Sequence, residues 1–167
     1  MSKLAFGCSH TEGIGVEPHE AWPALVEAIN FGRGGCSADY ILRVAPDIFE
    51  SHDPSVVYIL WPDWTRFEYI NEAGKIDQSL PTDPNRINFM EFATNEWLQN
   101  NFNNHVAHMK EICLENSIKL VDITLYDLIP YIDHADTWPL SKLGHHYSPV
   151  WHGWVADIFK KLENEQT

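Results

Sequence analysis

The sequence predicts a three-layer α/β/α fold with a mainly parallel sheet. Strand-like apolar runs alternate along the chain with segments of helical periodicity, which is the pattern of strands joined by crossover helices. The clearest strand is 55–61, a β-branched run bounded by proline on both sides. The chain has 167 residues, 44% of them hydrophobic, which is enough for one core. We therefore expect a single domain spanning residues 1–167.

Each expected element rests on a local pattern. Strands are expected at 4–6, 55–61 and 118–123, with a further strand end and glycine turn at 30–35. Helices are expected at 21–29, 37–49 and 90–116, with a final helix after residue 149 whose apolar face includes Trp151 and Trp154. Ser37 is the expected N-cap of the second helix. Residues 65–88 are rich in Pro, Asn, Asp and Gly, so they predict an irregular insertion, with a hairpin at Glu72-Ala73-Gly74.

Charge and composition restrict the class of partner. The formal net charge is −13, which argues against a nucleic-acid or anionic-membrane surface because both need clustered cations. No apolar stretch approaches the roughly 18 residues of a membrane span, and the sequence shows no signal peptide. Three cysteines without metal-site spacing predict reduced thiols. These observations favour a cytoplasmic protein, or one of the host cytoplasm or virion if it is phage-encoded, that binds a neutral ester or sugar.

Residues that could take part in catalysis follow several of the expected strands. Ser9, Gly35, Asp63 and the loop before the last helix fall at or just beyond strand ends. Ligands of doubly wound folds bind outside the carboxyl ends of the strands, so one crevice would collect these groups. Ser9 stands on the turn after the first strand, beside Gly7. A serine in this place exposes its Oγ next to unpaired backbone N–H groups, which suits a nucleophile that needs an oxyanion hole.

The order of these short segments resembles the SGNH, or GDSL-like, hydrolase superfamily. Its first block, Gly-Asp-Ser followed by Thr, is matched by Gly7-Cys8-Ser9-His10-Thr11, with Cys8 in place of Asp. Its second block, which supplies an oxyanion-hole glycine, is matched by Asn30-Phe31-Gly32-Arg33-Gly34-Gly35. The resemblance implies a flavodoxin-like (SGNH hydrolase) fold, with Ser9 as nucleophile and the N–H groups of Ser9 and Gly35 as oxyanion donors.

The third block of that superfamily, Gly-x-Asn-Asp, departs from the pattern here. The chain has Trp61-Pro62-Asp63-Trp64-Thr65-Arg66, with no Asn. An ionised Asp63 has no proton to donate. Thr65 or Arg66 could substitute, or the oxyanion hole could rest on two backbone N–H groups.

The last block, Asp-x-x-His, provides the base and its orienting carboxylate. The segment His146-Tyr147-Ser148-Pro149-x-x-His152 resembles it and makes His146 the expected base, with the adjacent His145 as the alternative. Leu143 occupies the position three residues upstream of His146, so the orienting carboxylate is assigned to Asp136, with Asp133 as the alternative; a Ser-His dyad is a further option.

Together these features predict a serine hydrolase that acts on carboxylic esters, either short acyl esters or glycan O-acetyl esters. The mechanism passes through an acyl-enzyme and needs no cofactor and no metal. One alternative is a non-catalytic binding or structural module, for example one associated with a phage virion, that kept the fold. The other is a metal-dependent hydrolase, with ligands drawn from His10, His134, His145, His146, His152, Asp133 and Asp136. The sequence leaves the oligomeric state open.

Overall fold

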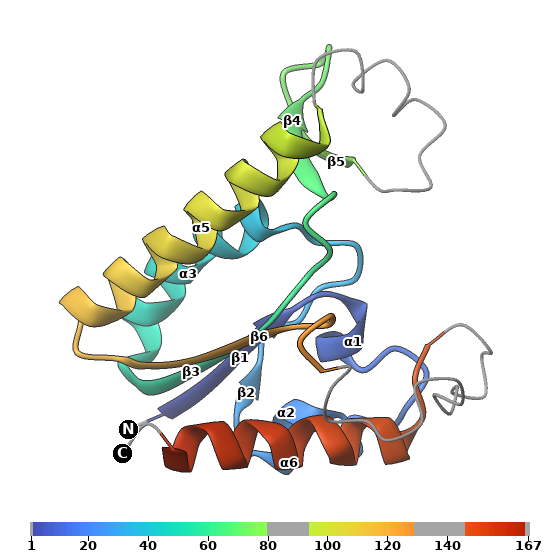
Figure 1. Cartoon of the computed structure of the whole chain (residues 1–167), viewed down its shortest axis with the longest axis vertical. Coiled ribbons are helices and arrows are strands. Elements are labelled where there is room, and N and C mark those ends of the chain that lie inside the picture. Colours follow the sequence, from blue (N-terminus) through green and yellow to red (C-terminus); the bar gives the residue numbers. More distant parts are fainter. Residues whose placement is uncertain (1, 80–93, 129–145, 166–167) are drawn as a thin grey trace.

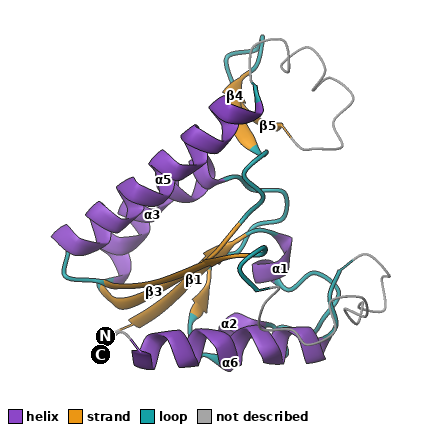
Figure 2. Ribbon diagram, in the orientation of Figure 1, coloured by secondary structure: helices purple, strands orange, loops and turns teal. Residues whose placement is uncertain are grey.

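The structure is a computed structural model that describes residues 2–79, 94–128 and 146–165. Its main sheet has the strand order β2-β1-β3-β6, and every pair in it is parallel. The strands are β1 (Ser2–Gly7), β2 (Ile29–Asn30), β3 (Pro54–Trp61) and β6 (Lys119–Thr124). Helices lie on both faces of this sheet (Figures 1 and 2), which confirms the predicted α/β fold with a parallel sheet.

The register of the strands brings their carboxyl ends to one edge of the sheet. Gly7 at the end of β1 pairs with Leu60 of β3, and Trp61 pairs with Thr124 at the end of β6. The turns that follow β1, β3 and β6 therefore leave the sheet at the same edge. Short α1 (Ser9–Glu12) lies there, immediately after β1 (Figure 1).

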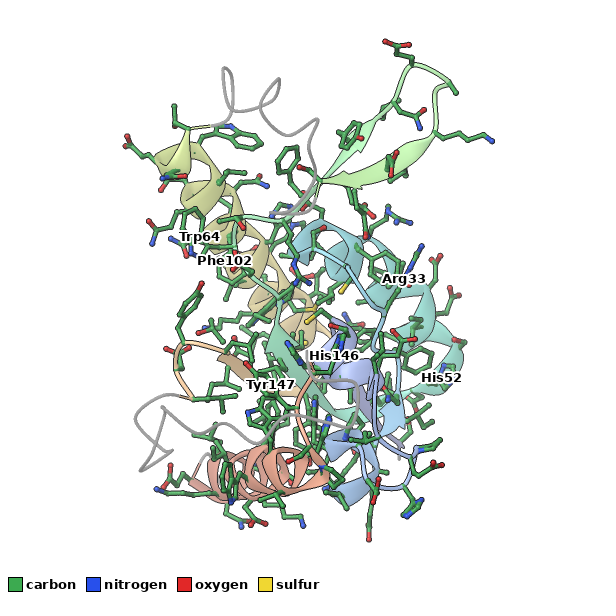
Figure 3. All side chains as sticks on the ribbon, turned by 90° about the vertical axis from the view of Figure 1, so that its right-hand side faces the viewer. Arg33, His52, Trp64, Phe102, His146 and Tyr147 are labelled. Carbon is green, nitrogen blue, oxygen red and sulfur yellow. The ribbon has the colours of Figure 1, made fainter. Side chains whose placement is uncertain are left out.

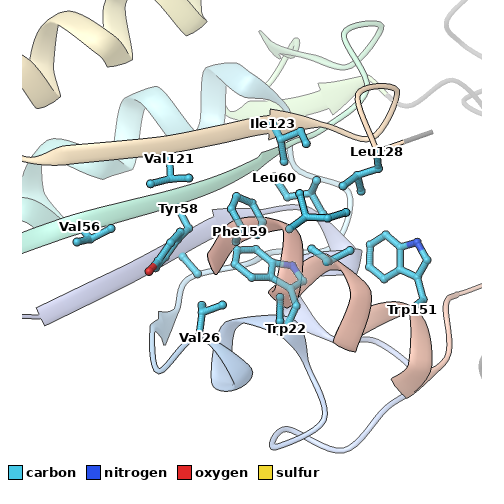
Figure 4. Close-up of a cluster of buried hydrophobic side chains, with 14 residues drawn as sticks. Trp22, Val26, Val56, Tyr58, Leu60, Val121, Ile123, Leu128, Trp151 and Phe159 are labelled. Carbon is cyan, nitrogen blue, oxygen red and sulfur yellow. The ribbon is translucent and has the colours of Figure 1, made fainter. Parts of the chain in front are cut away.

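A hydrophobic core fills the space on each side of the sheet. On one side, alternate residues of β3 and β6 pack against α2 (Trp22–Leu25) and α6 (Pro149–Glu165), with Trp22 stacked on Phe159 at 4.5 Å between ring centroids (Figure 4). On the other side, the opposite faces of β1 and β3 pack against α3 (Ala38–His52) and α5 (Asn95–Glu115). Because successive side chains of a strand point to opposite faces of the sheet, the same strands contribute to both cores.

The first predicted helix is much shorter than the sequence pattern indicated. The expectation was a helix over 21–29, but α2 ends at Leu25, and Ile29 belongs to β2. Glu27 adopts a left-handed φ of 60°, which stops the helix and turns the chain back into the sheet. The other N-terminal helix follows its prediction: Ser37 caps α3 by accepting a hydrogen bond from the N–H of Tyr40 at 3.3 Å.

The two C-terminal helices confirm their predicted positions, with one error in the apolar face of α6. In the described residues α5 starts at Asn95, capped by the Thr94 side chain, and residues 90–93 of the expected helix lie outside the described part. Trp154 was expected on the buried face of α6, yet it is 40% exposed. His152 is buried instead, at 1% exposure. The core beneath α6 therefore contains a polar side chain, the imidazole of His152.

The expected hairpin is present in the 65–88 region. Strands β4 (Phe67–Ile70) and β5 (Ile76–Ser79) pair antiparallel around the predicted turn, while residues 80–88 lie outside the described part. Arg43 of α3 makes two hydrogen bonds to Glu68 of β4, at 2.9 and 2.8 Å, and so ties the hairpin to the helix. Within the described residues, no helix is both long and apolar enough to cross a membrane.

Candidate active site

Ser9 begins the helical turn α1, directly after Gly7 and Cys8. The carbonyl of Cys8 accepts hydrogen bonds from the N–H groups of Thr11 and Glu12, both at 2.9 Å, and the carbonyl of Ser9 accepts from Gly13. The N–H groups of Ser9 and His10 have no acceptor in the described part of the chain, as expected at the first positions of a helical turn. The turn thus holds Ser9 beside two unpaired donors.

Glycine at position 7 is a steric requirement of this turn. A Cβ atom on Gly7 would lie 2.1 Å from Thr11 Oγ1 and 2.6 Å from the carbonyl oxygen of Leu60. Thr11 is fully buried and contacts this position from α1. The absence of a side chain at Gly7 therefore allows α1, with Ser9, to fold back onto the end of the sheet.

The glycine turn after β2 leaves one N–H group without a partner. Gly32 donates to Asn30 Oδ1 at 2.8 Å, Arg33 donates to the carbonyl of Gly7 at 2.9 Å, and Gly34 donates to Glu12 Oε2 at 2.5 Å. Cys36 donates its N–H to the carbonyl of Arg33. Gly35 alone in 32–36 has no acceptor among the described residues, and its φ of 76° suits glycine. Gly35 is the residue for which the sequence predicted an oxyanion-donor role, and its unpaired N–H is consistent with that prediction.

These two turns are held against one another. The Gly7 carbonyl accepts hydrogen bonds from the Arg33 N–H and from Cys36 Sγ, the latter at 3.2 Å. The position that a Gly34 Cβ atom would occupy lies 3.9 Å from Ser9 Cβ. The glycine turn is consequently a direct neighbour of the candidate nucleophile, although the two are separated by some 25 residues.

His146 approaches the nucleophile turn from the segment before α6. Its ring centroid is 5.7 Å from that of His10, the residue after Ser9. His10 also stacks on Tyr147 at 4.6 Å, and Tyr147 stacks on Trp151 at 4.3 Å. Figure 3, which looks onto the carboxyl ends of the strands, shows His146 and Tyr147 together in this region. Of the two adjacent histidines, His146 is within the described residues and lies at the site, whereas His145 lies outside them.

No pattern in the sequence indicated that His10 would be partly buried in this cluster. Burial lowers the pKa of His10 from its usual 6.5 to about 4, and the nearby His146 and Arg66 act in the same direction. His10 is therefore neutral at physiological pH, and its Nδ1 atom is buried without a hydrogen-bond partner among the described residues. A neutral imidazole next to Ser9 adds no competing positive charge to the site.

His152 has a structural role in α6. Its Nδ1 accepts a hydrogen bond from the backbone N–H of Trp22 at 3.2 Å, so that nitrogen carries no proton. Burial lowers the pKa of His152 to about 4. In the described ranges, no three His, Cys, Asp or Glu side chains are grouped so that they could hold a metal ion. Four of the ligands named for the metal alternative, His134, His145, Asp133 and Asp136, lie outside those ranges.

Asp63 and Thr65, at the end of β3, are bound to each other. Asp63 Oδ1 accepts hydrogen bonds from the Thr65 N–H at 2.8 Å and from Thr65 Oγ1 at 2.6 Å, while Oδ2 accepts from Tyr126 Oη at 3.2 Å. Burial raises the pKa of Asp63, but these hydrogen bonds outweigh it and the net shift is downward. Asp63 is therefore a carboxylate that accepts, and the Thr65 hydroxyl proton is already engaged.

Arg66 differs from these two neighbours. Glu68, two residues further along the chain, pairs with Arg43 and not with Arg66. The Nε and Nη1 atoms of Arg66 are buried and have no hydrogen-bond partner in the described residues. Sequence inspection could not reveal this, because the partner of Glu68 is decided by tertiary packing.

The predicted orienting carboxylate cannot be placed. Asp136 and its alternative Asp133 both lie outside the described residues. The described part of the site therefore contains the candidate nucleophile Ser9, the candidate base His146 and the candidate donors Ser9 and Gly35.

The fold is that of solved SGNH-type hydrolases. TesA superposes with a TM-score of 0.64 at 11% identity, covering 97% of both chains. The esterase EstA from Pseudoalteromonas sp., described as inhibited by monoethylphosphonate, gives 0.55 at 13% identity over 99% of this chain and 97% of its own. A family 3 carbohydrate esterase from Clostridium thermocellum gives 0.53 at 13% identity over 96% and 94%.

At these identities the likeness shows the fold alone. No protein-family model matches the sequence, and no curated protein matches it. None of the three proteins named above is described as a phage protein, so the phage origin gains no support from them.

Proposed function

We propose that this protein is a serine esterase that cleaves short acyl esters or glycan O-acetyl esters. One observation carries the proposal. In the two turns that meet beside Ser9, the unpaired backbone N–H groups of the described chain include those of Ser9, His10 and Gly35. Unpaired N–H groups beside a serine hydroxyl are what an oxyanion hole requires.

The reaction follows from these positions. Ser9 Oγ forms a bond to the ester carbonyl carbon while His146 takes the hydroxyl proton, and the N–H groups of Ser9 and Gly35 bind the resulting oxyanion. The tetrahedral intermediate collapses, the C–O bond to the alcohol breaks, and His146 returns the proton to the leaving alkoxide. Water then attacks the acyl-enzyme in the same way and releases the carboxylic acid. Asp136 is the proposed orienter of His146. Since Asp63 and Thr65 bind each other, we assign the hole to backbone donors.

The decisive experiment is labelling with a fluorophosphonate serine probe, together with turnover of 4-nitrophenyl acetate. Wild-type protein is expected to carry one label on Ser9, located by peptide mass spectrometry. Ser9→Ala is expected to lose the label and to lower kcat/KM by at least about 10³-fold. Ser51→Ala is the matched control, because the Ser51 hydroxyl contacts only groups at the end of α3, namely two backbone carbonyls and the His52 ring.

Equal labelling and equal turnover in wild type and Ser9→Ala would contradict the esterase proposal. That outcome would favour the non-catalytic module, which the missing third-block Asn already makes a coherent alternative. Loss of activity on treatment with a chelator would instead favour the metal-dependent reading.

A further inference from the structure

The glycine turn and the turn after β3 carry two arginines that have no carboxylate partner among the described residues. Arg33 lies between the glycines of the turn that touches Ser9, and its guanidinium stacks over the Tyr40 ring at 4.7 Å. Arg66 lies on the turn after β3, where its backbone N–H donates a hydrogen bond to the backbone carbonyl of Asp63. Neither makes an ion pair with an acidic side chain in the described ranges, whereas Arg43 nearby is paired with Glu68.

Arg66 is the more informative of the two because its guanidinium is partly buried. Nε and Nη1 are shielded from solvent without a hydrogen-bond partner in the described part, while the residue as a whole keeps some exposed surface. A buried cation without a partner is costly, and each such group calls for an explanation. The charge of Arg66 also lowers the pKa of Asp63, but that carboxylate already accepts hydrogen bonds from Thr65 and Tyr126 on its two oxygens.

The positive charges of both arginines act on groups at the candidate site. The charge of Arg66 acts on His10, next to the nucleophile, and on Cys36, next to the oxyanion glycine. Arg33 also acts on Cys36. Both positive charges thus act at the glycine turn of a chain whose formal net charge is −13, while the Arg33 side chain itself lines a pocket with Arg43, Glu68 and Asp77.

We propose that Arg66 recognises a carboxylate on the substrate, so that the preferred ester carries a negative charge near the scissile bond. This inference rests on the proposed esterase function and adds the substrate class. A guanidinium suits a carboxylate because its planar donors match the two oxygens. Exposed Arg33 adds a second positive charge that acts at the glycine turn. A local pair of cations is needed here because the acidic surface otherwise repels an anionic ester.

Two matched pairs of esters test the proposal, one for each side of the scissile bond. 4-Nitrophenyl hydrogen adipate and 4-nitrophenyl methyl adipate differ by a carboxylate on the acyl side. 3-Acetoxybenzoate and its methyl ester differ by a carboxylate on the alcohol side. After correction for hydroxide-catalysed rates, wild type is expected to prefer the anionic member of at least one pair by about tenfold in kcat/KM.

Arg66→Gln is expected to abolish that preference by raising KM for the anionic ester, with kcat/KM for the neutral ester unchanged within twofold. Lys75→Gln, the same charge change on the exposed turn of the hairpin, should leave the preference intact. An equal fall in kcat/KM for the anionic and the neutral ester, caused by a lower kcat, would overturn the proposal and would make Arg66 an oxyanion donor. An unchanged preference, or none in wild type, would overturn it as well.

A binding measurement separates failure of this inference from failure of the esterase proposal. The Ser9→Ala protein and the Ser9→Ala, Arg66→Gln protein are titrated with benzoate and with monomethyl adipate by calorimetry. The second protein is expected to bind at least one of the two anions about tenfold more weakly. Equal affinities would contradict the role of Arg66 whether or not the wild-type protein turns over an ester.

Discussion

In the described residues, the two ends of the parallel sheet differ in whether their polar groups have hydrogen-bond partners. At the amino end, Lys3 Nζ contacts Tyr58 Oη and Glu163 Oε1, both at 3.0 Å, and Tyr58 Oη donates to Glu163 Oε2 at 2.6 Å. Lys119 Nζ adds a hydrogen bond to the Glu163 carbonyl. This network joins β1, β3 and β6 to the last turns of α6, and each of its side chains has a partner.

At the carboxyl end the described residues leave buried polar atoms unpaired. They include Arg66 Nε and Nη1, His10 Nδ1 and Thr11 Oγ1, and the N–H groups of Ser9 and Gly35 join them. Unpaired buried groups cost stability, so the sheet is stabilised at one end and keeps free donors at the other. That division is what a binding site at the carboxyl ends requires.

The largest expected effect is the loss of the candidate base. His146→Gln is expected to lower kcat/KM for 4-nitrophenyl acetate by about 10³-fold or more, because Ser9 would lack a proton acceptor. The melting temperature should change little. His145→Gln is the paired variant and should keep most of the activity. Loss of activity in His145→Gln with retention in His146→Gln would show that the base is the other histidine.

Gly7→Ala is expected to cost about 3 kcal/mol of unfolding free energy, because its Cβ would collide with Thr11 and with the Leu60 carbonyl. Urea denaturation measures this change. Gly153→Ala in α6 provides the opposite control, since a Cβ there meets nothing within 4 Å. It should raise stability by up to about 1 kcal/mol. Equal stability of Gly7→Ala and wild type would contradict the close approach of α1 to the sheet.

The buried histidines predict a loss of stability in mild acid. The pKa of His152 is about 4 in the folded protein and near 6.5 in the unfolded chain. Between these values the unfolded chain binds more protons, so stability is intact above pH 6.5 and declines as the pH falls toward 4. The contribution of His152 reaches about 3 kcal/mol, and His10 acts in the same direction.

His152→Asn keeps an acceptor for the Trp22 N–H but does not titrate. Its free energy of unfolding should therefore fall less steeply between pH 6.5 and 4 than that of wild type. His19→Asn, at an exposed position, should keep the wild-type slope. Parallel curves for wild type and His152→Asn would contradict the neutral, buried state of His152.

The smallest effect is expected at the paired end of the sheet. Glu163→Gln should lower stability by about 1 kcal/mol, since Lys3 and Glu163 are partly exposed and solvent weakens their attraction. Ester turnover should be unaffected, because this network lies at the opposite end of the strands from Ser9. A change in kcat would show that the two ends are coupled.

The fold was largely predictable because its determinants are local. The β-branched run of β3, the Ser37 cap and the glycine turns each act within a few residues. The length of α2 and the exposure of Trp154 were mispredicted. Helical spacing around Ile29 looks the same whether the residue lies in a helix or pairs with Leu4 in the sheet, and only tertiary packing decides between them.

The candidate site was predictable where glycine marks it. Gly7 and Gly35 identified the two turns beside Ser9, and the structure shows why each needs glycine. The lack of a hydrogen-bond partner for Arg66 in the described chain and the partial burial of His10 depend on side chains distant in sequence, such as Arg43 and Tyr147. No local pattern encodes them. The carboxylate assigned to Asp136 stays a prediction.

The replacement of the first-block Asp by Cys8 has a practical consequence for chemical labelling. All three thiols are buried and unlinked, and burial raises the pKa of Cys36 and of Cys113 to about 12. Alkylating reagents react with exposed thiolates, so we expect the three buried thiols to react slowly with them at neutral pH. An electrophile that attaches to the native protein at a nucleophilic oxygen would therefore report on the hydroxyl chemistry of this chain with little background from sulfur.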